Sequence, residues 1–280
     1  MIEYLKKEVT TFVGNGIVSI IAPVTQALAY VSTFILKKST KSLKAICELC
    51  ESGYYEDAQI IARSIFEDSL TLAYICSADS DRRGGISIIT SDEFAQLYIL
   101  HGTEEQKKKR DHWKGLEEKG KCKDWIEGIK SNSNYEDFQK RYDGLRSHYR
   151  YPDLREQAKR YLVMKNRKDC RNEKTWNLLS IRGSAELVGD PYECDYHFLY
   201  WSISQLAHSS ALGSFGYYRE SKTVAVEMLP PLILGFAYYL RIAKNVNGVF
   251  KLGLDDKLNQ IEANFVKLYN ETPESAELER

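Results

Sequence analysis

The chain has 280 residues, 39 Lys plus Arg against 39 Asp plus Glu, and therefore no formal net charge. Its 43% apolar and 12% aromatic content excludes an intrinsically disordered chain and is typical of a globular protein with a sizeable core. Only six Pro occur, which leaves room for long helices in one large domain or two small ones.

The first distinctive segment runs from residue 9 to residue 36 and carries no charged side chain. Its length would allow a membrane span, but Asn15 and Gln26 would have no obvious partner in lipid. Two interpretations stay open: a buried core helix broken at Pro23, or a membrane or interfacial anchor. The chain shows no cleavable signal peptide and its six Cys are scattered, so we expect a cytoplasmic protein with free thiols.

A helical hairpin is predicted next. Apolar residues recur at helical spacing before and after Ser52-Gly53, which reads as the tight turn between two helices. The first face comprises Leu43, Ile46, Cys47 and Cys50, and the second comprises Ala58, Ile61, Ala62, Ile65, Leu72, Ala73 and Cys76. Because no second Cys or His pair follows Cys47-x-x-Cys50 at a zinc spacing, we expect buried thiols there and no metal site.

A surface loop is expected from Ser77 to Asp92, with a new helix starting at Ser91-Asp92. The following region, residues 101–175, has 21 Lys plus Arg and 14 Asp plus Glu, and we expect amphipathic helices packed less deeply than the rest. Its densest basic run is Lys107, Lys108, Lys109 and Arg110. One interpretation is a phosphate-facing binding surface. The other is a solvated helical face whose charges pair with neighbours.

The last third of the chain predicts further helices. They cover Trp176 to Leu187, Tyr192 to Tyr218, a helix that starts at Pro230-Pro231 and carries Leu232 to Val246, and Asp255 to Tyr269. An acidic tail, residues 271–280, is expected to fray. Since no strand pattern of useful length occurs, the prediction is an all-α single domain over residues 1–280, a helical bundle of about eight to ten helices.

Two short patterns mark a candidate site. Arg63 and Glu67 are four residues apart and share a helix face beside an apolar stripe, where a partly buried Arg needs a partner. Tyr200, Ser204 and His208 also recur every four residues and form one strip along a later helix. If the strip faces the pair, His208 could act as general acid/base, Arg63 as a phosphate clamp and Glu67 as the orienting group. A purely structural polar network is the alternative interpretation.

These patterns resemble an uncharacterised bacterial all-helical family, one of the domains of unknown function. The resemblance lies in A-x-x-x-x-R-S-x-F-E, residues 58–67, and in Y-x-x-x-S-x-x-x-H, residues 200–208, with Tyr74 and Trp176 between them. It covers roughly residues 46–215, with the basic middle region resembling an insertion. The family implies no settled activity.

A more distant resemblance is to the HEPN superfamily, which also pairs an Arg and a Glu on one helix with a His on a later one. Many of its members are metal-independent ribonucleases of toxin–antitoxin, abortive-infection and phage-defence systems. Their R-x(4–6)-H signature is not met, because Trp201, Ser202 and Ile203 occupy the positions of its Arg. The resemblance implies that Arg63, or a second subunit, supplies that cation, since such domains often dimerise.

Three hypotheses about function follow. The first is a cytoplasmic bacterial defence or toxin-type effector that cleaves RNA by acid/base chemistry without metal or cofactor, with His208, Arg63 and Glu67 as catalytic residues. Tyr200, Ser204 and the basic run at 107–110 would then bind RNA or a nucleotide. The second is a non-catalytic module that binds a nucleotide, nucleic acid or partner protein of a defence operon. The third is a membrane-associated effector that acts through residues 9–36.

Overall fold

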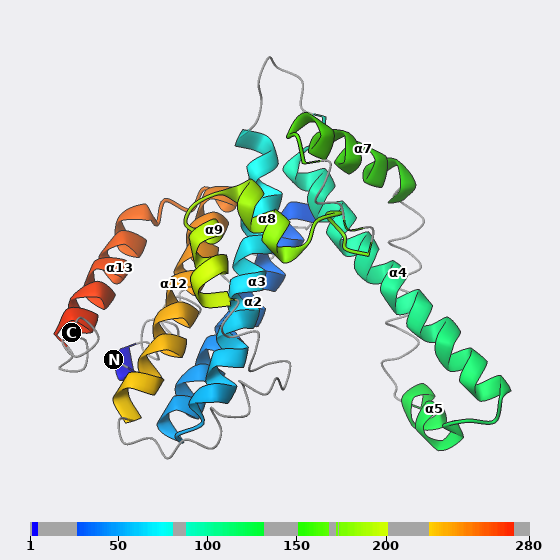
Figure 1. The fold of residues 1–280 in the computed structure, drawn as a ribbon, viewed down its shortest axis with the longest axis horizontal. Coiled ribbons are helices and arrows are strands. Elements are labelled where there is room, and N and C mark those ends of the chain that lie inside the picture. The colour runs from blue at the N-terminus through cyan, green and yellow to red at the C-terminus, as the bar shows by residue number, and fades with distance from the viewer. Residues whose placement is uncertain are drawn as a thin grey trace. The chain divides into compact units, whose positions relative to one another are not determined.

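The computed structural model describes residues 2–4, 27–80, 88–131, 151–167, 172, 174–200 and 224–271. Within these ranges the regular structure consists of helices, without strands, as the all-α prediction requires (Figure 1). The helices are α2 (Ala27–Glu51), α3 (Tyr55–Ser80), α4 (Ser91–Glu118), α5 (Lys123–Lys130), α7 (Tyr151–Met164), α8 (Ile181–Val188), α9 (Tyr192–Asp195), the π-helix η2 (Tyr196–Tyr200), α12 (Val224–Phe250) and α13 (Asp255–Asn270).

The chain forms two compact units. Unit 1 combines residues 1–77 with residues 181–280, and unit 2 comprises residues 78–180. The basic middle region predicted at 101–175 lies within unit 2. The three longest helices of unit 1 are α2, α3 and α12, which run side by side in Figure 1, and α13 packs on α12.

The turn between α2 and α3 confirms the predicted helical hairpin. Helix α2 ends at Glu51 and α3 begins at Tyr55. Gly53 has a φ of +80°, a left-handed conformation that side chains with a Cβ rarely adopt. The amide N–H of Tyr54 then donates to the Leu49 carbonyl at 2.9 Å. This hydrogen bond gives a partner to a backbone carbonyl in the last turn of α2. Glycine therefore fixes the reversal of the chain that brings α2 alongside α3.

Close packing in unit 1 centres on Gly235 of α12. Both Leu43 and Ile46 of α2 are fully buried, as is Ile65 of α3. A Cβ built on Gly235 would lie 2.7 Å from Ile46 Cδ1, 3.4 Å from Leu43 Cδ1 and 3.8 Å from Ile65 Cδ1. The missing side chain thus lets α12 approach the α2–α3 hairpin at this point.

Gly235→Ala is expected to destabilise the fold, because overpacking costs about 1–3 kcal/mol and outweighs the gain of about 1 kcal/mol in helix propensity. Ile46→Val removes the Cδ1 atom that would clash. The double variant of Gly235→Ala and Ile46→Val should therefore lose less stability than the sum of the two single losses. Gly248→Ala in the same helix meets nothing within 4 Å and should leave stability unchanged or raise it. Urea unfolding of the four variants measures this, and equal effects at 235 and 248 would contradict it.

Three predicted boundaries were wrong. Helix α12 begins at Val224 and runs through Pro230 and Pro231, so the proline pair does not start it. Helix α8 begins at Ile181, not at Trp176, because turns occupy 174–178 and Leu178 has a φ of +62°. Helix α3 continues to Ser80, beyond the predicted loop start at Ser77. The predicted helix start at Ser91-Asp92 is confirmed, because α4 begins at Ser91, where the Thr90 side chain accepts from the Glu93 amide.

Helices α4 and α7 pack together in unit 2, and α5 folds back on the far end of α4. Phe94 of α4 contacts Tyr161 of α7 edge-on at 5.3 Å between ring centroids. Trp176 packs edge-on against Phe94 at 6.3 Å and against Tyr98 at 5.3 Å. Trp176, one of the positions that carry the family resemblance, therefore has a packing role in the core of unit 2.

The segment at residues 9–36 is described only from Ala27 onward, so the expected break at Pro23 lies outside the described residues. In α2 the side chains of Val31, Ile35 and Leu36 are buried, as the core-helix interpretation predicts. None of the described helices is long and apolar enough to cross a membrane. The predicted helix 192–218 is described only to Tyr200, and the tail only to Glu271.

The Cys47-x-x-Cys50 pair is buried, as predicted, and neither cysteine forms a disulfide. Burial raises the pKa of the Cys50 thiol to about 12, and the neighbouring Cys47 and Glu51 add to the shift. A thiol with so high a pKa is a poor nucleophile and metal ligand near neutral pH. The pair therefore contributes to the core.

Candidate functional site

Arg63, Glu67 and Tyr200 form a closed triangle of hydrogen bonds. The Arg63 Nε donates to Glu67 Oε1 at 3.0 Å, and its Nη2 donates to the Tyr200 hydroxyl at 2.8 Å. That hydroxyl donates in turn to Glu67 Oε1 at 2.8 Å. The guanidinium also lies over the Tyr200 ring, with Cζ 4.8 Å from the centroid. The contact predicted between the two sequence patterns is therefore present for Tyr200.

The triangle has a closed side and an open side. The Arg63 side chain is 16% exposed, whereas the Glu67 side chain is 38% exposed. Burial raises the pKa of Tyr200 well above its usual range, and the Glu67 carboxylate that accepts its hydrogen bond adds to the shift. Tyr200 therefore stays a neutral phenol, and Glu67 is the member of the triangle that a solvent-borne ligand reaches most easily.

An aromatic cluster supports this triangle. Phe66 is 3% exposed and contacts the rings of Tyr200 at 5.2 Å, Tyr238 at 4.9 Å and Tyr192 at 6.1 Å between centroids. Tyr196 stacks on Tyr200 at 5.2 Å with an interplanar angle of 22°. These contacts fix the Tyr200 ring from two sides, so its hydroxyl meets Arg63 and Glu67 in one orientation.

A second arginine of unit 1 has a similar environment, which the sequence patterns did not indicate. Arg241 of α12 donates to Asp195 Oδ2 at 2.9 Å and lies 4.8 Å over the Tyr238 ring and 5.4 Å over the Tyr192 ring. The sequence did contain one signal for the tyrosines of this environment. The four-residue interval that links residues 200, 204 and 208 extends backward to Tyr196 and Tyr192. The segment that carries these tyrosines includes the π-helical turn η2, a geometry common at functional sites.

A buried carboxylate, Asp68, lies one residue beyond Glu67 on α3. Lys38 donates to Asp68 Oδ1 at 2.7 Å, and Ser39 donates to Oδ2 at 3.4 Å. Burial raises the pKa of Asp68, and the contacts with Lys38 and Ser39 oppose that rise without cancelling it. The Asp68 side chain is 9% exposed, whereas Lys38 is 43% exposed and retains water. The pair ties α2 to α3 at an energetic cost to the carboxylate.

Asp68→Asn tests this cost through pH. Because the folded pKa lies above the unfolded one, the folded state binds more protons in the window between them. Wild-type stability should therefore fall as pH rises through that window, from about pH 4 upward, and then level off. The variant should lack this part of the slope and match or exceed the wild type at pH 7. Urea unfolding between pH 4 and 8 measures both, and an unchanged slope would contradict the assignment.

The other predicted site residues fall into two groups. Ser204 and His208 are outside the described residues, so their predicted approach to Arg63 stays a prediction. The basic run at 107–110 lies on α4 in unit 2, with Lys108 and Lys109 exposed and Lys107 and Arg110 half-buried. Lys108 donates to Glu105 at 2.7 Å, the neighbour pairing that the solvated-face interpretation expects. The ligand-binding role predicted for this run stays a prediction.

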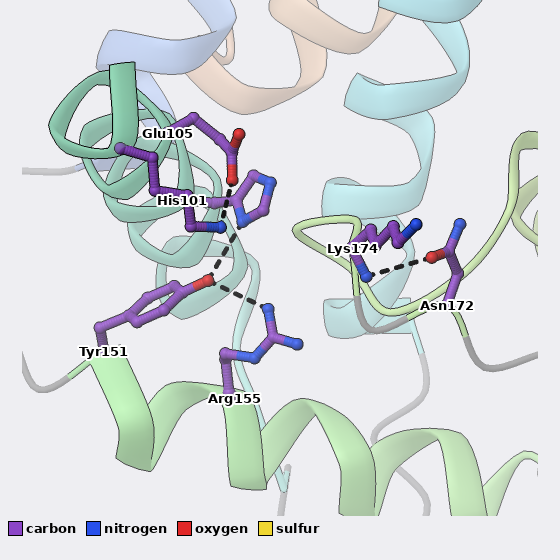
Figure 2. A network of polar contacts seen from close by, with 7 residues as sticks. His101, Glu105, Tyr151, Arg155, Asn172 and Lys174 are labelled. Atoms are coloured by element: carbon purple, nitrogen blue, oxygen red, sulfur yellow. Dashed lines mark hydrogen bonds and ion pairs between the residues drawn. The ribbon is translucent and has the colours of Figure 1, made fainter. Parts of the chain in front are cut away.

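A second polar network joins α4 to α7 in unit 2 (Figure 2). The Arg155 guanidinium donates to the Tyr151 hydroxyl at 3.0 Å, and that hydroxyl lies 3.1 Å from His101 Nδ1. Burial lowers the pKa of His101, and Arg155 and Lys108 lower it further against the opposing effect of Glu105. A neutral His101 can accept a hydrogen bond from the Tyr151 hydroxyl at Nδ1 and carry its own proton on Nε2. The network fastens the two helices and leaves one imidazole N–H as a donor.

Among the described residues, no three His, Cys, Asp or Glu side chains gather in a way that could hold a metal ion. The triangle instead offers a cation, a carboxylate and a phenol, a set that can bind or orient a polar or anionic group.

The fold and these contacts define an all-helical protein with an Arg–Glu–Tyr network in an aromatic surround. The model of a family of unknown function (DUF5677) matches residues 29–223, and the chain belongs to that family. The predicted membership in an uncharacterised helical family is thereby confirmed. No curated protein and no solved structure matches the chain.

Proposed function

We propose that the protein is an RNA-cleaving effector of the defence or toxin type, with the Arg63–Glu67–Tyr200 triangle as part of its active site. The observation that carries the proposal is the meeting of Arg63 and Glu67 with Tyr200, across 137 and 133 positions of sequence. Tyr200 opens the Y-x-x-x-S-x-x-x-H pattern, so the same segment leads to Ser204 and His208. The resemblance to HEPN nucleases supports the reaction type.

The chemistry needs no metal because RNA supplies its own nucleophile. A base removes the proton of a 2′-hydroxyl, O2′ bonds to the adjacent phosphorus, and the bond from phosphorus to O5′ breaks as that oxygen takes up a proton. His208 is the proposed acid/base group, since imidazole titrates near neutral pH. Arg63 would stabilise the charge that grows on the phosphate oxygens, with Glu67 and Tyr200 holding its guanidinium. A homodimer would add a second Arg63.

A second function is a non-catalytic binding module, and one observation favours it. Both Nε and Nη2 of Arg63 already donate within the triangle, so the guanidinium is largely committed to the protein itself. A ligand could then meet Glu67 and the aromatic surround without chemistry at His208. Nucleotides, nucleic acids and partner proteins of a defence operon are the candidate ligands of such a module.

Induction of the protein in growing cells separates the two functions. Wild type should arrest growth and fragment cellular RNA, whereas His208→Ala should do neither while keeping the helical circular dichroism spectrum of the wild type. Asn247→Ala, which alters a polar side chain that donates to Asp255, is a control for general loss of stability. Intact RNA in wild-type cells would exclude the ribonuclease and favour the binding module.

A further inference from the structure

The end of α4, the turn that follows it and α5 form a lysine-rich helical hairpin in unit 2, here called the α4–α5 tip (residues 107–130). Helix α4 ends at Glu118, and the turn is held by the Gly120 amide on the Glu117 carbonyl and the Lys121 amide on the Leu116 carbonyl, both at 2.9 Å. Ile126 is 5% exposed and faces the packed side of α5. The tip thus contains a buried apolar side chain, and its two helices contact each other.

Trp125 lies next to Ile126 but takes no part in that packing. The residue is 79% exposed, the largest value among the exposed large apolar residues of the described ranges. An indole is among the largest apolar surfaces that a side chain can bury, and tryptophan is rarely left open to water to this extent. A flat aromatic face held on an ordered helix is a surface on which another flat group can stack.

Positive charge predominates along the tip. Residues 107–130 contain nine Lys or Arg and five Asp or Glu, and Asp124 and Glu127 are the acidic residues nearest the indole. Lys119, Lys121 and Lys123 alternate through the turn and are all exposed. The ion pair of Lys123 with Glu127 is long, at 3.9 Å, and both side chains are more than half exposed, so it neutralises little of the charge.

We propose that the α4–α5 tip binds single-stranded nucleic acid, with Trp125 stacking on a base and Lys119, Lys121 and Lys123 contacting phosphates. Basic side chains that follow the backbone, together with an aromatic ring that accepts any base, are the features by which proteins hold single strands. A duplex hides its base faces in the stack and could use the lysines alone. This surface would hold the strand on which the proposed ribonuclease acts, so its biological role rests on the proposed function.

The test uses a fluorescein-labelled single strand of 2′-O-methyl RNA, which cannot be cleaved through its 2′ oxygen, and fluorescence anisotropy. Trp125→Ala should weaken binding about 10-fold, whereas Trp125→Phe should retain most of it. A triple variant with Gln in place of Lys119, Lys121 and Lys123 should bind more weakly. The slope of log K against log[salt] should also become shallower by about two. The matched control changes Lys37, Lys41 and Lys44 to Gln, three exposed lysines of α2, and should bind like the wild type.

Two further probes define the ligand: single-stranded DNA should bind through the same residues, and duplex RNA should be insensitive to Trp125→Ala. Failure of wild type to bind the single strand, or identical binding by wild type and Trp125→Ala, would overturn the proposal. If Trp125 variants lose binding but wild type cuts no RNA, the surface stands and the ribonuclease falls. If RNA is cut and the Trp125 variants bind normally, the ribonuclease proposal stands and the proposal for the α4–α5 tip is wrong.

Discussion

Phe66→Ala is expected to lower the free energy of unfolding by about 3–5 kcal/mol, the largest effect of any single change described above. Phe66 is nearly fully buried and contacts the rings of Tyr192, Tyr200 and Tyr238, which come from α9, η2 and α12. Its removal would leave a cavity at the point where these three elements meet α3. Denaturant unfolding monitored by circular dichroism measures the loss.

A matched control exists on the neighbouring helix. Phe34 of α2 is 48% exposed, so Phe34→Ala should cost less than about 1 kcal/mol. Phe66→Leu keeps most of the buried volume and should cost about 1.5 kcal/mol or less. Equal losses at positions 34 and 66 would show that the aromatic cluster around Phe66 does not organise unit 1.

Glu67→Ala is expected to cost about 1–3 kcal/mol, because it removes the acceptor of both Arg63 Nε and the Tyr200 hydroxyl. We expect a cost in the lower half of that range, because the Glu67 side chain is 38% exposed and water can replace part of the lost contact. The measurement is the free energy of unfolding in denaturant, compared with that of the wild type at the same pH.

A double variant tests whether the triangle acts as a unit. Arg63→Met combined with Glu67→Leu removes both charges together, so it should cost less than the two single changes summed. The control is Glu271→Ala, which breaks the i,i+4 pair with Lys267 at 3.7 Å, both side chains being well exposed. That change should cost less than about 0.5 kcal/mol. Strict additivity of the Arg63 and Glu67 effects would contradict the closed triangle.

Local signals predicted much of the fold. The helical spacing before and after Ser52-Gly53 predicted the hairpin, since a glycine that follows a periodic segment has a direct structural meaning. The approach of Arg63 and Glu67 to Tyr200 was also predictable, because a partly buried arginine requires a partner and four-residue spacing places such partners on one helix face.

Other features depend on contacts that local sequence does not encode. Pro230 and Pro231 are typical of a helix start, yet α12, which packs on α2, runs through them. The network of His101 with Tyr151 joins residues 50 positions apart, and no spacing rule indicates it. The partnership of Arg241 with Asp195 likewise depends on how α12 packs beside α9.

The most direct test of the proposed active site compares RNA cleavage with thermal stability in one set of purified variants: Arg63→Ala, Arg63→Lys, Glu67→Gln and His208→Ala. If the triangle and His208 together form the active site, His208→Ala should abolish cleavage with a melting temperature near that of the wild type. Arg63→Lys should lose most activity with a smaller loss of stability than Arg63→Ala, because lysine keeps the charge but not the planar fork. Wild type that leaves RNA intact, with melting temperatures that fall at Arg63 and Glu67, would instead assign the triangle a structural role.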